Sequence, residues 1–446
     1  MKIKLTSTLL LLTSFVFGQS KPEKTDFTLQ EAIDYALEYA YEIQDASDDI
    51  EQAEQQVRET KAIGLPQIDG SVSYQNYLIQ QVSLIPAEIN GGPAGEYIPI
   101  TFNTKQNAGI GAELNQLIFD GSYLIGLKGI KVYLEGIEKA KIKTEFVVKE
   151  VVGNAYTYVL LVEENYKILQ SNKAILEKNL RETQAMVTNG FSEEQDAEQI
   201  ELNLSAIVND IQNTETILAS AYRMLNIALG IDVDIQLTLT ETLESLMIDN
   251  IRMELVNQEF DIKNHIDYQI SKTQKDYQEL NVKYERSKNY PNIGAFINYN
   301  TSAFSDDFTF TDSDQQWFDS SLVGVQMNIP IFSSFQRNAR TQQAKIELDK
   351  AERNLTVTEQ NLLVQLTDAQ NDYEYAIESY YVAKNNLDLA ERIEKKTNIK
   401  YTEGLSSSFD LSNAQNQLYD KQRVYLESIL YLINSRIKLE NILNIK

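Results

Sequence analysis

The spacing of hydrophobic residues along the chain switches between a helical period and a strand period. After Thr28, apolar residues recur about every 3.5 positions as far as Val57. Gly64-Leu65-Pro66 ends this pattern, so we expect one helix between Thr28 and Gly64. Thr28 and Glu31 have the spacing of a capping box, which marks the start of that helix.

Beyond this helix the period falls to two. Apolar and polar residues alternate around Val72–Asn76 and again along Ala108–Leu114, which predicts two strands with one apolar and one polar face. A Pro- and Gly-rich stretch between them, PAEINGGPAGEYIP, is typical of a loop. Together these segments predict a β-hairpin over about 68–118.

A very long helical pattern follows the hairpin. No proline appears from Ser122 to about Thr188, and apolar residues from Val148 to Leu180 follow a heptad seam that is interrupted at Lys173. At 1.5 Å per residue, such a helix measures roughly 100 Å. Asn189-Gly190 predicts a turn, and Ser192 with Gln195 predicts the capping box of a further helix that ends near Leu229.

The second half of the chain repeats this order. A helical segment leads to a predicted hairpin at about 292–332 around the acidic loop SDDFTFTDSDQQ, then to a long helix, a break at Glu403-Gly404 and a last helix. Equivalent landmarks are a nearly constant distance apart, as Gly190 and Gly404 or Asp196 and Asp410 show. We therefore expect a first repeat at 19–232, a linker at 233–254 and a second repeat at 255–446.

The junction between strand and helix also occurs twice in the sequence. LNQLIFDG at 114–121 is matched by MNIPIFSS at 327–334, so Phe119, Asp120 and Gly121 correspond to the segment around Pro330, Ile331 and Phe332. We interpret each copy as the point where a strand ends and a long helix starts, with Asp120 as a helix cap.

Composition narrows the function. The first residues, 1–18, have a positive start and a short apolar run, and predict a secretory signal peptide. The net charge of −25 opposes binding to nucleic acid. With no cysteine and with His265 as the only histidine, the chain offers no metal cluster and no catalytic triad, so we expect neither an enzyme nor a cofactor or metal.

Four amphipathic strands are too few to close a membrane barrel, because the smallest common barrels have about eight strands. Open strand edges are not tolerated in lipid. If the hairpins enter a membrane, several chains must therefore share one barrel. In the last strand we expect Val323, Val325, Met327 and Ile329 to face lipid, and Gly324, Gln326 and Asn328 to face the lumen.

At this point the sequence resembles the TolC-like outer membrane efflux proteins. The resemblance lies in the opening segment TLQEAIDYALEYAYEIQDASDDIEQAEQQVRETKAIGLPQIDGSVSY, in the IFDG and NIPIF junctions, and in YTEGLSSSFDLSNAQNQLYD, and it covers about 26–446. It implies a mostly α-helical, tandem-repeat protomer with membrane β-structure. Three such protomers would form a shared 12-stranded outer membrane barrel and a long periplasmic α-helical barrel.

The resemblance also implies partners and a place in the cell. The protein would lie in the outer membrane of a Gram-negative bacterium, in contact with its lipid, and extend into the periplasm. As a homotrimer it would receive cargo from a periplasmic adaptor and an inner-membrane transporter, in efflux or type I secretion.

A periplasmic gate is implied at the turns at Gly190 and Gly404. In the resembled family an acidic residue at the position of Asp410 lines the closed mouth, and Asp196 is its counterpart in the first repeat. Two usual gate residues are replaced, by Asn413 and by Ser406. Three copies of Asp410 near one axis would attract cations and raise the pKa of at least one carboxyl. The alternative is a solvated aspartate in a first helical turn.

Other functions remain as alternatives. A structural coiled-coil protein of the periplasm without transport would need no alternating strands. An envelope enzyme would need acid–base groups that this composition scarcely supplies. A periplasmic adaptor would have one helical hairpin between β-rich halves rather than a twofold repeat.

Overall fold

The computed structural model describes residues 24–445, and all of their side chains except those of 248–250. The signal peptide expected at 1–18 lies outside this range. Contacts divide the chain into two compact units. We call Ala46–Lys143 with Asp261–Val364 the sheet unit, and the described residues up to Asp45 with Thr144–Phe260 and Gln365 onward the coiled-coil unit.

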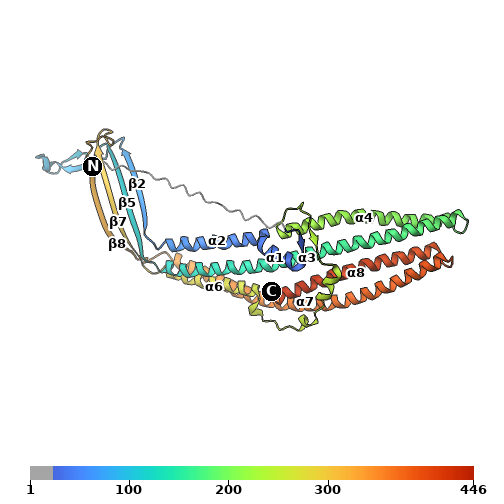
Figure 1. The fold of residues 1–446 in the computed structure, drawn as a ribbon. Coiled ribbons are helices and arrows are strands. Elements are labelled where there is room, and N and C mark those ends of the chain that lie inside the picture. Colours follow the sequence, from blue (N-terminus) through green and yellow to red (C-terminus); the bar gives the residue numbers. More distant parts are fainter. Residues whose placement is uncertain (1–23, 446) are drawn as a thin grey trace. The chain divides into compact units, whose positions relative to one another are not determined.

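Four long antiparallel strands lie side by side in the sheet unit, in the order β2-β5-β7-β8 (Figure 1). Their bounds are β2 Gln67–Asn76, β5 Gln106–Phe119, β7 Asn292–Ser305 and β8 Phe318–Asn328. The two predicted hairpins therefore join into one sheet, because β5 of the first pairs with β7 of the second. The edge strands are β2 and β8, each with one neighbour in the described chain.

The register sorts the side chains by face, since directly paired residues of an antiparallel sheet lie on the same side. Val323, Val325 and Met327 pair with Ile297, Ala295 and Ile293, and so share one apolar face. Gly324, Gln326 and Asn328 lie on the opposite face. Ile329 is outside β8, so the expectation that it continues the strand is wrong.

The helices of the sheet unit follow the order of the strands. α2 (Tyr41–Ala62) contacts α3 (Gly121–Thr188) through Lys141 and Ser47. α3 contacts α6 (Ile266–Ser287) through the Lys143–Asp267 ion pair, and α6 contacts α7 (Gln336–Thr402) through Ser271 and Thr358. Each helix adjoins in sequence the strand of the same rank, so the layer of helices continues the sheet.

We had expected the Pro- and Gly-rich stretch between β2 and β5 to be a loop, and this expectation is wrong. It contains a small hairpin of β3 (Ser83–Pro86) and β4 (Tyr97–Ile100), joined through the 3-10 helix η1 (Ala87–Asn90). Pro86 is the last residue of β3 and Pro99 the last but one of β4, positions at strand ends where a missing N–H costs little.

The coiled-coil unit combines long helices with a small mixed layer. The long helices are α3, α4 (Glu194–Leu229), α7 and α8 (Ser408–Ile442); the other elements are β1 (Asp26–Phe27), α1 (Leu29–Tyr39), β6 (Thr238–Leu239), α5 (Leu243–Asn250) and the 3-10 turn η2 (Met253–Asn257). A second 3-10 turn, η3 (Ile262–Asn264), precedes α6 in the sheet unit. β1 and β6 pair in parallel. The predicted long helices after each hairpin therefore exist, with 68 residues in α3 and 67 in α7.

The core of the coiled-coil unit follows the predicted seam. Val148, Val152 and Val159 of α3 are buried against residues of α4, α7 and α8. Tyr156 is fully buried and donates its hydroxyl to the Phe27 carbonyl oxygen at 2.9 Å, which ties β1 to α3. Among the described helices, none has both the length and the apolar character to cross a bilayer.

The first predicted helix is interrupted. The capping box of Thr28 and Glu31 is present, but Ala40 has an extended backbone and separates α1 from α2. Gly230, which follows α4, packs closely against this break. A Cβ atom at Gly230 would lie 2.4 Å from the Tyr39 carbonyl oxygen and 3.0 Å from Ala40 Cα.

Candidate functional site at the interhelical turns

The two interhelical turns have the same backbone. At the end of α3, the Gly190 N–H donates to the Val187 carbonyl and the Phe191 N–H to the Met186 carbonyl. At the end of α7, Gly404 donates to Tyr401 and Leu405 to Lys400 in the same pattern. Both glycines have a left-handed conformation, with φ of 75° and 73°, which is the Schellman ending of a helix.

Both turns are followed by a capping box. In α8, the Ser407 side chain accepts from the Asp410 N–H, and the Asp410 carboxylate accepts from the Ser407 N–H. In α4 the partners are Glu193 and Asp196. The expected pair of Ser192 and Gln195 is therefore wrong by one residue, because Ser192 lies just outside the helix and donates to Asp196 at 2.6 Å.

Asp196 also joins the two turns. Its second carboxylate oxygen accepts a short hydrogen bond from the Ser408 hydroxyl at the start of α8. Partial burial acts to raise the pKa of Asp196, but the hydrogen bonds from Ser192, Ser408 and the Glu193 N–H outweigh burial and hold the pKa below its ordinary value. Asp196 is thus part of an intramolecular contact between the turns.

Asp410 is exposed, and within the described chain its carboxylate accepts hydrogen bonds from Ser406 and Ser407 of its own turn. Hydrogen bonds from the Ser407 hydroxyl, the Ser407 N–H and the Ser406 hydroxyl lower the pKa of this carboxyl. The raised pKa that we expected applies to three copies near one axis and stays a prediction; the direction found here is that of a single chain. Within one protomer the capping serines determine it.

The replaced gate positions differ in their contacts. Ser406 donates to Asp410 at 3.2 Å, so it belongs to the same turn. Asn413 is exposed on α8, nearly one helical turn after Asp410. The structure therefore brings Ser406 to Asp410 and Ser408 to Asp196.

A layer of polar side chains lies behind the turns. The Tyr401 and Thr183 hydroxyls are buried and 2.8 Å apart, and they join α7 to α3. Asn203 donates to Ser412 at 2.8 Å and joins α4 to α8. Sequence reasoning missed Ser408, because a serine in a first helical turn carries no signal of its distant partner.

The strand-to-helix junctions differ from one another. Phe119 ends β5, and the Asp120 carboxylate accepts from the N–H groups of Ser122 and Tyr123 at the start of α3, which confirms the cap. After β8, Pro330, Ile331 and Phe332 belong to a longer irregular segment before α7. Ile331 is 90% exposed, so an apolar side chain faces outward here.

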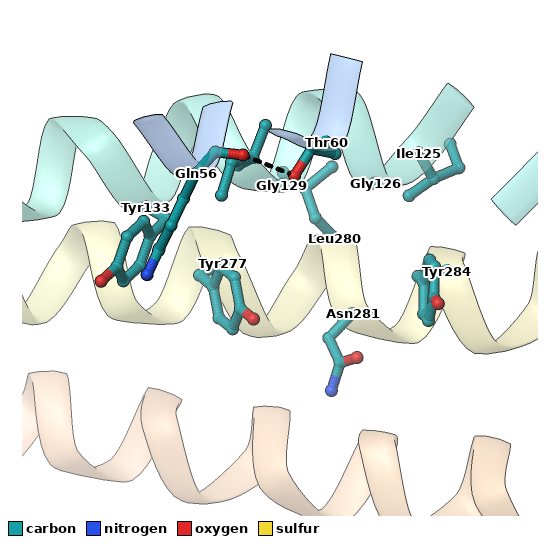
Figure 2. A pocket seen from close by; sticks show the side chains of 11 residues that line it. Gln56, Thr60, Ile125, Gly126, Gly129, Tyr133, Tyr277, Leu280, Asn281 and Tyr284 are labelled. Atoms are coloured by element: carbon teal, nitrogen blue, oxygen red, sulfur yellow. Dashed lines mark hydrogen bonds between the residues drawn. The ribbon is translucent and has the colours of Figure 1, made fainter. Parts of the chain in front are cut away.

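Another candidate ligand site is a cavity of about 490 Å³ between α2, α3 and α6 (Figure 2). Tyr133, Tyr277 and Tyr284 line it, with Gly126 and Gly129 of α3. No residue of this lining is charged, and the Thr60 hydroxyl is already bonded to the Gln56 carbonyl. Nothing in the cavity indicates a particular ligand.

Titratable groups elsewhere have structural roles. His265 is buried, caps α6 by accepting from the Asp267 N–H, and has a pKa lowered by burial. Tyr222 donates to Glu163 at 2.5 Å between α4 and α3. Within residues 24–445, no group of three or more acidic or histidine side chains is placed to hold a metal ion.

Acid is expected to remove the contribution of Asp196 to the turns. Because its folded pKa is below the unfolded value of 3.8, the stabilisation is complete above about pH 4 and is lost as the pH falls through the folded pKa. At pH 6, Asp196→Asn should therefore speed hydrogen exchange in peptides around 186–200. The difference from the parent protein should shrink as the pH falls below 4. A difference that is the same at both pH values would contradict this role.

Comparison with known proteins supports the assignment of the fold. Residues 264–444 match the family described as outer membrane efflux protein. A crystal structure of CusC, described in terms of folding and transmembrane channel formation, superposes with a TM-score of 0.72 at 17% identity and covers 93% of this chain and 91% of its own. No curated protein matches the sequence.

Two further structures agree. The outer membrane protein VceC from Vibrio cholerae gives a TM-score of 0.70 at 15% identity, over 93% of this chain and 95% of its own. The CmeC outer membrane channel from Campylobacter jejuni gives 0.71 at 17% identity, over 93% and 85%. These superpositions show a shared fold. Together with the family match, they confirm the resemblance that the sequence motifs indicated.

Proposed function

Because the chain resembles the outer membrane efflux proteins in sequence and fold, we propose that it forms an outer membrane export channel. The channel is a passive duct from periplasm to exterior, in a tripartite efflux or type I secretion system. It lies in the outer membrane of a Gram-negative bacterium and extends into the periplasm. It is not an enzyme, and its partners are a periplasmic adaptor and an inner-membrane transporter.

The open four-stranded sheet is the observation that carries this proposal. Val72 on β2 and Val325 on β8 are 82% and 73% exposed in one chain, although both belong to apolar strand positions. Lipid would cover such a face, but lipid does not tolerate the unpaired edges of β2 and β8. Pairing β8 of one copy with β2 of the next covers both edges. With three copies, as the resemblance implies, the barrel has 12 strands.

The chain order supports the same assembly. We retain the division into two repeats, 19–232 and 255–446, with a linker at 233–254, as part of the proposal. Each repeat supplies one hairpin and two long helices, so copies placed in a ring give a sheet and a helical layer with matching order.

Assembly is tested by fractionation and mass measurement. We expect the protein in the outer membrane fraction, a slower band on SDS-PAGE before boiling, and a mass of three chains in detergent. A stable monomer that conducts ions in planar bilayers would contradict the shared barrel. A trimer that does not conduct would favour the alternative, a structural envelope-spanning protein without transport.

The gate proposal concerns Asp410. Three exposed carboxylates in a narrow mouth should attract cations, so Asp410→Asn should lower cation selectivity and weaken block by divalent ions in single-channel recordings. Folding should change little, because a surface cap contributes about 1 kcal/mol. The control is Glu352→Gln, which removes an exposed carboxylate from a different helix, α7. If both variants conduct like the parent channel, Asp410 is only a helix-turn aspartate.

A further inference from the structure

The segment between β2 and β5 forms an arm, residues 77–105, whose small hairpin projects sideways near the end of the sheet that is farther from the helices (Figure 1). Its base is closed by hydrogen bonds from the Tyr77 N–H to the Lys105 carbonyl and from the Gln80 amide to the Asn103 carbonyl. The second repeat has only the short acidic loop 306–317 at the equivalent place. The arm is therefore a feature of one repeat.

The arm exposes an unusual amount of apolar surface. Leu78 and Ile79 are each 91% exposed. The other exposed apolar side chains of the arm are Val82, Leu84, Ile89, Tyr97 and Phe102. So many large exposed apolar side chains in one short segment indicate an interaction surface.

The arm does not bury these side chains by its own folding. In the two-stranded β3–β4 sheet, Ile85 pairs with Ile98 on one face and Leu84 with Pro99 on the other, so both faces are apolar. A hairpin of two strands is marginally stable in water unless another surface covers it. The arm thus needs a partner on at least one face.

Membrane lipid is a poor candidate for that partner. Polar residues at the base of the arm separate its β3–β4 hairpin from the apolar face of the sheet. This collar consists of Gln75, Asn76, Gln80, Gln81, Asn103, Thr104, Lys105, Gln106 and Asn107. With lipid around the sheet, the collar lies at the membrane surface and the β3–β4 hairpin lies outside the membrane.

A second copy of this chain fits the arm better. The chain carries a net charge of −25, so most pairs of like surfaces repel each other. The arm has only Glu88, Glu96 and Lys105 as charged residues, and copies can approach through it with little repulsion. It also continues from β2, the edge strand that has to meet a neighbouring copy in the proposed ring.

We propose that the arm is a clasp between copies, whose apolar faces pack against the outer end of the neighbouring protomer. This inference rests on the proposed shared barrel. It assigns to residues 77–105 a role in holding the ring together outside the membrane.

Photo-crosslinking tests the clasp, and the absence of cysteine makes single-site labelling clean. Ile89→Cys, at the tip of the arm, and Ser73→Cys, on edge strand β2, are each labelled with benzophenone maleimide in outer membranes. We expect both to crosslink to a second copy, with peptide mapping placing the Ile89 product in the neighbour's arm or its 306–317 loop.

The outcomes separate the two proposals. If the probe at position 73 reaches a second copy but the probe at position 89 reaches lipid, another protein or nothing, the clasp is overturned and the shared barrel stands. If neither probe reaches a second copy, both the barrel and the clasp are overturned.

A second measurement does not depend on the probe. Ile89→Asn removes an apolar side chain from the tip without adding charge, and Asn90→Ser is the matched polar control. We expect Ile89→Asn to lower by several degrees the temperature at which the oligomer dissociates on SDS-PAGE, and Asn90→Ser to leave it unchanged. Equal dissociation temperatures for all three proteins would count against a clasp.

Discussion

Val325→Arg should prevent normal assembly, while Gln326→Arg should permit it. Val325 shares the apolar face of β8 with Val323 and Met327, and Gln326 lies on the opposite face. An arginine on a lipid-facing strand position costs about 2–4 kcal/mol near the bilayer midplane, whereas a lumen-facing arginine stays hydrated. The measurement is the yield of heat-sensitive oligomer in the outer membrane fraction.

Comparing the two variants shows which face of β8 contacts lipid. Both variants add the same charge to neighbouring residues of one strand, so a general effect of charge on expression would appear in both. If Gln326→Arg fails and Val325→Arg assembles, the polar face is the one in lipid. If both assemble equally well, the sheet is not in a membrane.

Gly230→Ala should destabilise the coiled-coil unit by roughly 3 kcal/mol or more. Gly230 has a φ of 70°, and an added Cβ would lie 2.4 Å from the Tyr39 carbonyl oxygen, so backbone would have to move. The strain of a positive φ and the clash of the added Cβ therefore both destabilise this variant. Thermal unfolding followed by circular dichroism in detergent should show a clear drop in melting temperature.

Gly190→Ala and Gly404→Ala are controls for this prediction. Both glycines have a similar positive φ, but an added Cβ would meet no described atom within 4 Å. These two variants should carry only the conformational cost of roughly 1–2 kcal/mol. A similar loss in all three variants would mean that the close approach at Gly230 does not matter.

The fold was predictable where local rules dominate. The heptad seam of α3, the alternation in β5 and the turn glycines Gly190 and Gly404 each depend on residues close in sequence. The break at Ala40 was not predicted, and the residue that packs closely against it, Gly230, is far along the chain. The β3–β4 hairpin was hidden by prolines and glycines that are as common in loops as at strand ends.

At the candidate site, too, local features were predictable and contacts between distant residues were not. The repeat offset correctly placed Asp196 and Asp410 at equivalent positions, and both complete a capping box. It did not reveal that only Asp196 has a partner in the other turn, since that depends on how α4 and α8 pack. The equivalent positions of the two aspartates in the repeats predicted the same local geometry, but not the same surroundings.

The Ser408–Asp196 hydrogen bond therefore reduces the symmetry of the proposed ring. By backbone alone, the turns of successive repeats are interchangeable. With one carboxylate held by Ser408 and its counterpart exposed, chemically different turns alternate around the rim. A partner with identical repeated contacts would meet two kinds of site in turn, and could distinguish the first repeat from the second at every step around the ring.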